Sequence, residues 1–327
     1  VEMHYFNELQ YFTNPELDAI PYKAFAGCAS LQEITLPPQI TSIGNYAFGY
    51  ATNNLGQITP CSSLHSIVIP EGVTAIGSYA FSHCGLESIV LPSTLTTIGQ
   101  LAFEACSSLM TDIYLPASVT NLTYNPFASS GIETIEVDPL NPAFDSRNVC
   151  NAIIKTSTNE LISGCKNTII PDDVVSISAL AFASATGLTS ITLPASVASI
   201  GASAFQSCTG LTTIYAESYT PPTTHSTAFA NTTPANVTVY VPCLSLETYQ
   251  TYNNGSPWGG FTNFVGEGCE YTHNLPAGWK WWAPFVGNTA AALMETLDDS
   301  NIQGDILVNS QNEGFLRRTG DNWGGTL

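Results

Sequence analysis

Charged residues are scarce in this sequence, and basic residues are the scarcest. Only 10% of the 327 residues are Asp, Glu, Lys or Arg, and seven Lys plus Arg face 26 Asp plus Glu, which gives a formal net charge of -19. Such a surface repels nucleic-acid phosphates and anionic lipid head groups. The sequence also has no apolar run near the roughly 18 residues that a membrane-spanning helix needs. We therefore expect neither a nucleic-acid partner nor insertion into a membrane.

The short motifs of catalytic and metal sites are missing as well. The sequence contains no H-E-x-x-H, G-x-S-x-G, phosphate-loop or C-x-x-C pattern, and such patterns bring a nucleophile, a base or a set of metal ligands together. The five histidines are scattered along the chain: His4, His65, His83, His225 and His273. Acidic pairs such as Asp172 with Asp173 fit solvated turns better than a catalytic dyad. We predict that the protein is not an enzyme and binds no metal or cofactor.

What the sequence does contain is a short internal repeat. A small residue followed by Phe recurs at Ala24-Phe25, Ala47-Phe48, Ala80-Phe81, Ala102-Phe103, Pro126-Phe127, Ala181-Phe182, Ala204-Phe205 and Ala228-Phe229. Most intervals between successive Phe residues are nearly equal, whereas those from Phe48 to Phe81 and from Phe127 to Phe182 are longer and indicate insertions. The regular period, of about 23 residues, is typical of stacked-repeat proteins.

Each repeat follows the pattern L-x-x-I-x-L-P-x-x-V-T-x-I-G-x-x-A-F-x-x-C, as in residues 31–48 and 188–205. Apolar residues two apart in L-x-x-I-x-L predict a short strand, which pairs with its copy in the next repeat at about 4.8 Å. The V-T-x-I-G stretch predicts a second extended segment, and A-F-x-x-C predicts about one helical turn with Phe in the core. Because one repeat cannot bury its own apolar face, the sequence predicts a β-rich α/β solenoid with short strands and short helical turns.

These repeats resemble the BspA-like family of leucine-rich repeats, found on bacterial surface and secreted proteins. The resemblance covers residues 5 to about 267 and implies a right-handed array with adhesion-type binding, no enzyme activity and no cofactor. Residues 145–165 resemble the hairpin insert of the family, which accounts for the long interval between Phe127 and Phe182. Val239 to Pro242, with Leu246, Tyr249, Trp258 and Phe261, resemble its closing strand and helix.

We divide the chain into three parts. Residues 1–239 form the solenoid, with about eight modules and a hairpin insert at 138–170, and residues 240–270 form its closing strand and helix. Residues 271–327 hold four of the five tryptophans, Trp279, Trp281, Trp282 and Trp323. They predict a small β-rich or α+β module, which we expect to be cut short. Its Trp residues could be a sugar-stacking platform, but they are more often the core of a small domain.

The cysteines fall into two groups. Five share one position in the repeat, which predicts a column of buried thiols rather than a metal cluster: Cys28, Cys61, Cys84, Cys106 and Cys208. Cys150 and Cys165 lie on opposite arms of the hairpin insert, and Cys243 and Cys269 bracket the closing segment. Each of these pairs is a candidate disulfide in an oxidising compartment, although four cysteines allow three connectivities.

Candidate binding residues come from the strand row, because the residues that flank Ile in L-x-x-I-x-L point away from the core. Most of these positions are small and uncharged. Five could offer a partner an aromatic or charged contact: Glu33, Asp112, Tyr114, Glu136 and Tyr215. The alternative is that they are ordinary cross-strand stabilisers on a solvated sheet.

Two functions fit the sequence. The first is an extracellular interaction or adhesion scaffold, monomeric and secreted or held at the cell surface, that binds a host or bacterial surface protein or glycan. Solenoids favour this function because they offer extended surface rather than one deep pocket. In the alternative, the array is a structural spacer that displays residues 271–327 as the ligand-binding or anchoring module.

Overall fold

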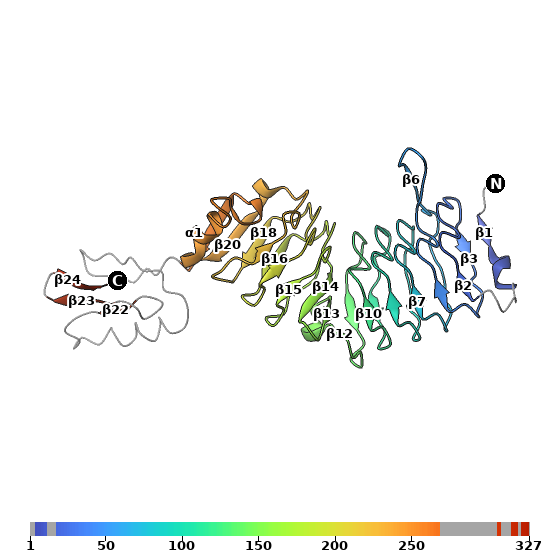
Figure 1. The fold of residues 1–327 in the computed structure, drawn as a ribbon, viewed down its shortest axis with the longest axis horizontal. Coiled ribbons are helices and arrows are strands. Elements are labelled where there is room, and N and C mark those ends of the chain that lie inside the picture. Colours follow the sequence, from blue (N-terminus) through green and yellow to red (C-terminus); the bar gives the residue numbers. More distant parts are fainter. Residues whose placement is uncertain (1–3, 12–17, 269–305, 309–314, 320–321, 327) are drawn as a thin grey trace.

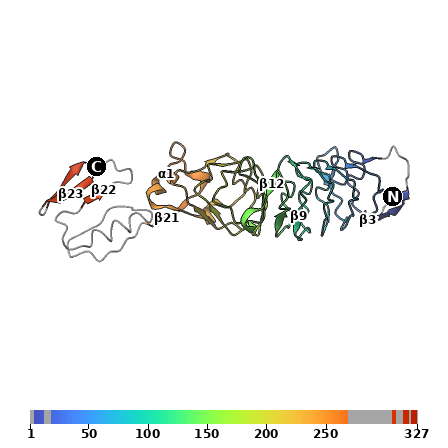
Figure 2. The ribbon, with the colours of Figure 1, turned by 90° about the horizontal axis from the view of Figure 1, so that it is seen from below.

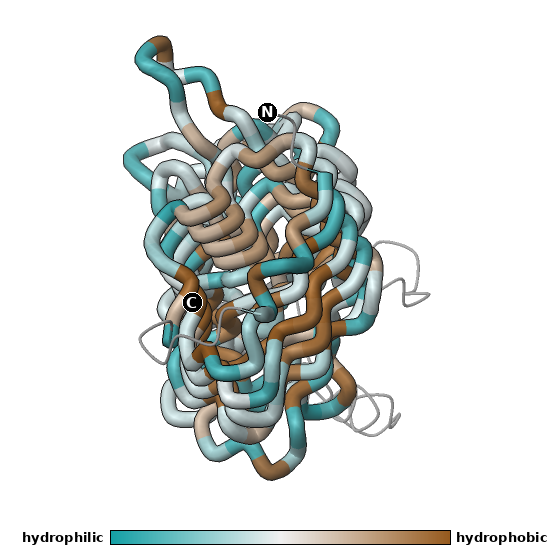
Figure 3. Tube along the Cα trace, turned by 90° about the vertical axis from the view of Figure 1, so that its right-hand side faces the viewer, coloured by the Kyte–Doolittle hydropathy of each residue, from teal (hydrophilic) through white to brown (hydrophobic). Residues whose placement is uncertain are grey.

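The computed structural model describes residues 4–11, 18–268, 306–308, 315–319 and 322–326. Through residues 4–11 and 18–268 the chain winds through a stack of similar coils, which form an elongated β-solenoid with little helix (Figures 1 and 2). Along the long axis the coils lie one behind another, and their apolar stretches superimpose (Figure 3). The predicted stack of repeats is confirmed, while its right-handed direction stays a prediction.

The L-x-x-I-x-L stretches form a first row of parallel strands. This row comprises three sheets: β1 (Tyr5–Phe6) with β3 (Glu33–Ile34), β9 (Ile113–Leu115) with β11 (Ile135–Val137), and β16 (Ser190–Leu193), β18 (Thr213–Ala216), β20 (Thr238–Pro242) and β21 (Asn263–Glu267) in that order. A parallel bridge between Thr35 and Val68 continues the row after β3. Parallel pairing follows because the chain returns to the same face once per coil.

The T-x-I-G stretches form a second row. Its strands β2 (Ala19–Ile20), β4 (Ser42–Ile43), β7 (Ala75–Ile76), β8 (Thr97–Ile98) and β10 (Asn121–Leu122) make one parallel sheet, and β15 (Ser176–Ile177), β17 (Ser199–Ile200) and β19 (Thr223–Thr224) belong to another. The Ile of this stretch is buried in coil after coil, for example Ile43 and Ile76, each at 1% exposure. Both rows therefore direct their apolar side chains into one shared core.

The Ala-Phe turn holds neighbouring coils together. The Phe amide of each regular coil donates to the carbonyl of the residue before the next Phe, at 2.7 to 2.8 Å, as between Phe48 and Ala80. The Phe rings stack at centroid distances of 4.9 to 5.4 Å on either side of one interruption. Ala80 and Ala102 are fully buried, which leaves no room for a larger side chain.

The predicted helical turn in this segment is wrong. Successive amides alternate between a carbonyl three residues back and a carbonyl of the next coil: Ala24 donates to Pro21, whereas Phe25 donates to Ala47. This alternation requires left-handed backbone at the residue before Ala, with φ of 55° at Tyr46 and 57° at Tyr79. Left-handed residues interrupt a right-handed helix, so the segment is a chain of turns.

The repeat cysteines form a thiol column beside the Phe ladder. Each thiol donates to the Phe carbonyl of the preceding coil: Cys61 to Phe25 at 2.9 Å, Cys84 to Phe48 at 3.2 Å, Cys106 to Phe81 at 3.1 Å and Cys208 to Phe182 at 3.0 Å. Burial raises the pKa of both Cys106 and Cys208 to about 12. The prediction of buried thiols is confirmed for these four.

The first long interval, between Phe48 and Phe81, contains a hairpin that projects from the second coil. Its strands β5 (Ala51–Thr52) and β6 (Ile58–Thr59) pair antiparallel, and the hairpin rises above the neighbouring coils (Figure 1). The side chain of Asn53 organises the turn, because its oxygen accepts from the amides of Leu55 and Gln57 at 2.9 and 3.0 Å. Leu55 at its tip is 81% exposed.

The second long interval, between Phe127 and Phe182, contains the insert that interrupts the first row between β11 and β16. Its strands β12 (Phe144–Asp145), β13 (Ala152–Lys155) and β14 (Glu160–Gly164) pair antiparallel, with the one-turn 3-10 helix η2 (Arg147–Val149) between the first two. The insert is buried on both faces: Ile153 packs into the N-terminal hydrophobic cluster and Ile154 into the C-terminal one. The core is therefore divided in two by this sheet.

The predicted disulfide between Cys150 and Cys165 is wrong, since both thiols are free. Ala152 lies opposite Gly164 in the antiparallel register, which places Asn151, not Cys150, across from Cys165. A shift of one residue turns a side chain to the other face of a sheet. Cys165 accordingly packs in the N-terminal cluster and Cys150 in the C-terminal cluster.

Asn125 joins the two halves at the insert. It is 1% exposed, and its side-chain nitrogen donates to the carbonyls of Leu180 and Ala181 at 3.0 and 2.9 Å. Its oxygen accepts from the amide of Phe127 at 2.9 Å and from the hydroxyl of Ser163 at 2.7 Å. One side chain thus replaces several of the coil-to-coil bonds that a regular repeat would supply.

Aromatic residues close the C-terminal end. Strand β20 is followed by η4 (Cys243–Ser245), α1 (Leu246–Gln250), η5 (Trp258–Gly260) and β21. Trp258 and Phe261 are fully buried and cover the last ring of the Phe ladder, Phe229, at centroid distances of 5.5 and 4.8 Å. Cys243 takes part in a disulfide bond. Its predicted partner, Cys269, lies outside the described residues.

Five further elements complete the description. The 3-10 helices η1 (Asn7–Tyr11) and η3 (Pro234–Asn236) belong to the first coil and to the loop before β20. Near the C-terminus, β22 (Ile306–Val308), β23 (Phe315–Thr319) and β24 (Asn322–Thr326) form an antiparallel sheet. Trp279, Trp281 and Trp282 lie outside the described residues, so the separate C-terminal module stays a prediction.

The Phe ladder gives a first stability prediction. We expect Phe103→Ala to lower the free energy of unfolding by about 3–5 kcal/mol, because it removes a fully buried ring and leaves a cavity. Urea unfolding followed by circular dichroism measures the change. Leu55→Ala at the exposed hairpin tip is the control, and an equal loss in both variants would contradict the role of the ladder.

Asn125 gives a second prediction. We expect Asn125→Ala to leave the buried Phe127 amide and the Ser163 hydroxyl without their partner, and so to cost about 1–3 kcal/mol per unsatisfied group. The two halves should then unfold at separate urea concentrations, detected as two transitions. Asn121→Ala, at an exposed position of the same coil, should keep the wild-type profile. A single unshifted transition for Asn125→Ala would refute this coupling.

Candidate binding face

An exposed apolar stripe crosses three consecutive coils on the first strand row. Val68 and Val90 are each 81% exposed, and Tyr114 in the next coil is 48% exposed. They occupy equivalent positions between two buried residues, as Val90 lies between Ile89 and Leu91, so period-two alternation turns them outward. Single exposed apolar residues are ordinary, but a contiguous row marks a contact surface. We call the row formed by Val68, Val90, Tyr114 and Glu136 the strand stripe.

The stripe ends in a polar group formed by β9 and β11. Tyr114 lies directly opposite Glu136 in the parallel register. A hydrogen bond with the Asp138 carboxylate raises the pKa of Tyr114, with smaller contributions from desolvation and from the charges of Asp138 and Glu136. Asp112, at the start of β9, accepts a hydrogen bond from the Thr134 hydroxyl. An aromatic hydroxyl and three carboxylates therefore adjoin the apolar part.

A cleft of about 530 Å³ opens beside this polar group, between β11 and the insert. Its walls include Glu136 and Asp138 from β11 and its following loop, and Asp145, Arg147 and Val149 from the insert. Val149 is 83% exposed. This volume is within the range of about 300–1,000 Å³ that small-ligand sites and side-chain pockets occupy. The cleft can receive a side chain or sugar unit from a partner that lies on the stripe.

The cation in the cleft is already paired. The Arg147 guanidinium donates to Asp145 through Nε at 2.8 Å and Nη2 at 2.7 Å, to Asn159 at 3.0 Å, and also to Asp173. These contacts, above all the hydrogen bond to Asp145, raise the pKa of Arg147. Arg147 therefore fixes the loop of the insert against the next coil, and the free charge of the cleft is negative.

The structure brings together three of the five predicted binding residues. Asp112, Tyr114 and Glu136 meet on β9 and β11. Glu33 lies opposite Tyr5 at the N-terminal end of the row. Tyr215 lies beyond the insert, where its ring stacks on Tyr240 at 5.0 Å. All five are on the same strand row, but they form three separate groups.

The sequence reasoning did not identify a tyrosine cluster on the turn column. Tyr46 and Tyr79 stack at 4.7 Å, and Tyr22 and Tyr50 meet Tyr46 edge-on at 6.2 and 5.5 Å. The Lys23 ammonium lies 5.3 and 5.5 Å from the ring centres of Tyr22 and Tyr46. A signal was present, because Tyr46 and Tyr79 both stand two residues before a repeat Phe. Since these rings cover one another, the cluster supports the left-handed turns.

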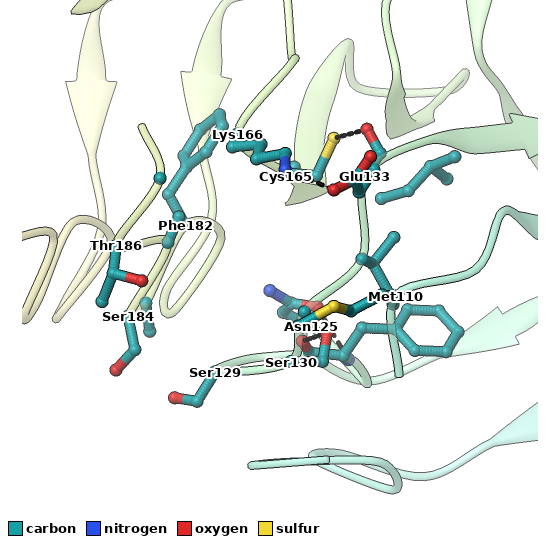
Figure 4. Close-up of a pocket in the computed structure, with 18 residues that line it drawn as sticks. Met110, Asn125, Ser129, Ser130, Glu133, Cys165, Lys166, Phe182, Ser184 and Thr186 are labelled. Atoms are coloured by element: carbon teal, nitrogen blue, oxygen red, sulfur yellow. Dashed lines mark hydrogen bonds and ion pairs between the residues drawn. The ribbon is translucent and has the colours of Figure 1, made fainter. Parts of the chain in front are cut away.

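A smaller pocket of about 200 Å³ lies where the Phe ladder is interrupted (Figure 4). Met110 and Ser129 line it from the N-terminal half and Phe182 from the C-terminal half. Its charged groups are matched, because Lys166 pairs with Glu133, and the Cys165 thiol donates to the Glu133 carbonyl at 3.1 Å. This pocket is too small and too well satisfied to be the main site.

No group of three or more His, Cys, Asp or Glu side chains in the described part of the chain is placed to hold a metal ion. Among the same residues, no helix has the length and apolar character needed to cross a bilayer.

Stacked coils, two parallel strand rows and an extended outward face define a β-solenoid repeat protein. A family model described as "BspA type Leucine rich repeat region (6 copies)" matches residues 3–60, 18–147 and 152–254, so the chain belongs to the BspA-type leucine-rich repeat family. The resemblance on which the sequence analysis relied is therefore confirmed. Proteins of this family are typically interaction scaffolds at bacterial surfaces rather than enzymes.

Several solved structures are similar to this chain. A leucine-rich repeat protein from Eubacterium ventriosum is 22% identical, with a TM-score of 0.49 over 72% of this chain and 68% of its own. A leucine rich cell surface protein from Faecalibacterium prausnitzii is 22% identical, with a TM-score of 0.48 over 82% and 83%. A leucine-rich repeat protein from Bacteroides ovatus is 23% identical, with a TM-score of 0.46 over 75% and 63%. No curated protein matches the chain.

The contact between Tyr114 and Asp138 gives a third prediction. We expect Asp138→Asn to lower the pKa of Tyr114, because the neutral amide no longer disfavours the tyrosinate. Nuclear magnetic resonance titration of the labelled Tyr114 ring carbons measures the midpoint. Asp112→Asn is the control, since Asp112 is not among the groups that shift Tyr114. An unchanged midpoint in Asp138→Asn would contradict the hydrogen bond between Tyr114 and Asp138.

Proposed function

We propose that this chain is a non-enzymatic, extracellular interaction scaffold that binds a protein or glycan of a host or neighbouring cell through the strand stripe and the adjoining cleft. In this proposal it acts as a monomer, secreted or held at the cell surface. The observation that carries the proposal is the continuous exposed row of Val68, Val90 and Tyr114 leading into an open cleft.

The chemistry of the stripe favours a protein over a glycan as the main partner. Two Val side chains and a Tyr ring form a flat apolar strip, which a protein covers with apolar side chains of its own. Tyr114 is the expected energetic centre, because Tyr is enriched among the residues that dominate binding. The carboxylates of Glu136 and Asp138 at one end, on a chain of net charge -19, favour a partner with basic residues there.

The family gives independent support of a general kind. BspA-type leucine-rich repeat proteins are generally adhesion or protein-interaction proteins, and a solenoid places many small contacts along one surface. The position of the stripe on the solenoid and the chemistry of its partner are our proposal for this chain.

Binding by the purified full chain tests the proposal. We expect capture of at least one protein from a panel of immobilised extracellular-matrix proteins and a glycan array. Tyr114→Ala should weaken that capture by about 30-fold, the effect of losing roughly 2 kcal/mol at an interface centre, and Val90→Glu should weaken it further. Surface plasmon resonance measures both.

Tyr124→Ala is the matched control, because Tyr124 has a similar exposure of 41% and lies off the stripe. It should bind like the wild type. Absence of any partner at micromolar concentration would contradict the scaffold proposal. Capture that is unchanged in both Tyr114→Ala and Val90→Glu would move the site elsewhere and favour the spacer alternative, with residues 271–327 as the binding module.

A further inference from the structure

Cys28 differs from the other members of the thiol column. It lies in the first complete coil, and of the seven free cysteines in the described part of the chain it alone is half-buried, whereas the other six are buried. A reagent in solution can therefore reach Cys28 without local unfolding.

The thiol of Cys61, in the next coil, lies against Cys28. The Cys61 thiol donates to the Phe25 carbonyl at 2.9 Å, and the Cys28 amide donates to the same oxygen at 3.2 Å. The backbones approach closely at this point, because a Cβ on Gly27 would lie 2.6 Å from that of Ala51. Neighbouring coils are about 4.8 Å apart, within the Cα separation of roughly 4.4–6.8 Å that a disulfide spans.

The environment makes Cys28 a nucleophile near neutral pH. The interaction with the Cys61 side chain lowers the pKa of Cys28 to about 7, against the opposing effect of partial burial. Cys84 and Cys106 occupy the same column position in two consecutive coils, but both are buried, and burial raises the pKa of each. The chain therefore carries a reactive pair, Cys28 and Cys61, and an unreactive pair, Cys84 and Cys106, at the same position of the repeat.

We propose that Cys28 is a site of thiol-disulfide exchange and that its product is a Cys28–Cys61 disulfide joining the first two complete coils. The oxidant is a small-molecule disulfide of the class of oxidised glutathione. The Cys28 thiolate attacks one of its sulfurs, a mixed disulfide forms on Cys28, and one thiolate leaves. Cys61 then loses its proton and attacks the Cys28 sulfur, which expels the second thiolate. Two protein thiols are oxidised and one small disulfide is reduced to two thiols.

The cross-link closes the chain segment that contains the second coil and the projecting hairpin β5–β6. A bond at this place stabilises the contact between these two coils and the base of the hairpin under oxidising conditions. This inference does not depend on the strand stripe or on its partner.

Oxidation of the full chain tests the proposal. After incubation with oxidised glutathione near pH 7, intact-mass analysis should show the loss of two hydrogen atoms, and peptide mapping should assign the new cross-link to Cys28 and Cys61. Cys61→Ser should instead retain glutathione on Cys28, because the resolving thiol is missing. Cys84→Ser should behave like the wild type.

Urea unfolding gives a second readout. The oxidised wild type should unfold at a higher urea concentration than the reduced protein. Cys28→Ser should abolish this difference, and it should keep the fold because position 28 is only half-buried.

The pH dependence of alkylation is a second measurement that does not require the cross-link. The rate of Cys28 labelling by iodoacetamide should rise with a midpoint of about 7, and Cys61→Ala, which removes the side chain that interacts with Cys28, should move that midpoint upward. At neutral pH, Cys28 should react at least about tenfold faster than Cys84, because reactivity follows thiolate content and exposure. A cross-link mapped to Cys84 and Cys106, or equal labelling of Cys28 and Cys84, would overturn the proposal.

Discussion

The amide of each repeat Phe donates to a carbonyl in the following coil, and its ring stacks on the following ring. These two contacts set the spacing of the coils, and the other features of the solenoid follow from that spacing. The residue before Phe is Ala in every coil but the one with Pro126, and Ala80 and Ala102 are fully buried between the turns. The thiols of the Cys column reach the Phe carbonyls of the preceding coil. Left-handed backbone at Tyr46 and Tyr79 is tolerated because the next coil holds it.

The Phe ladder is interrupted between Phe127 and Phe182, and this interruption explains the position of the cleft. No ring stacking joins Phe127 and Phe182 among the described aromatic pairs, and Asn125 and the two-faced sheet of the insert connect the halves instead. The sheet of the insert continues into the second row, where β14 pairs in parallel with β15, and it leaves the first row broken between β11 and β16. Its loop, fixed by Arg147, therefore stands beside β11 and forms the second wall of the cleft. The cleft beside the proposed binding face thus results from the interruption of the repeat.

Much of the fold could be predicted from the sequence, because period-two burial and a fixed repeat depend on residue type alone. The strand row, the buried thiols and the positions of both insertions are of this kind. The turn conformation could not be predicted, since the left-handed backbone at Tyr46 depends on a hydrogen bond to Ser78 in the next coil. The register of the insert was also inaccessible, and a difference of one residue separates Cys150 from Cys165. On the binding face, Tyr114 and Glu136 could be predicted from alternation, whereas Asp138 and Arg147 depend on how the insert folds back.

The bonds of the turn column all run in one direction, from an amide to a carbonyl of the following coil, as from Phe25 to Ala47 and from Phe205 to Ala228. The array therefore has a polarity in this column. Its first turn presents carbonyl oxygens to whatever precedes it, and its last turn, at Phe229, presents amides toward the closing aromatic residues. Two elements with opposite hydrogen-bonding character are needed to end the stack, so a second copy of this chain could extend the column only head to tail.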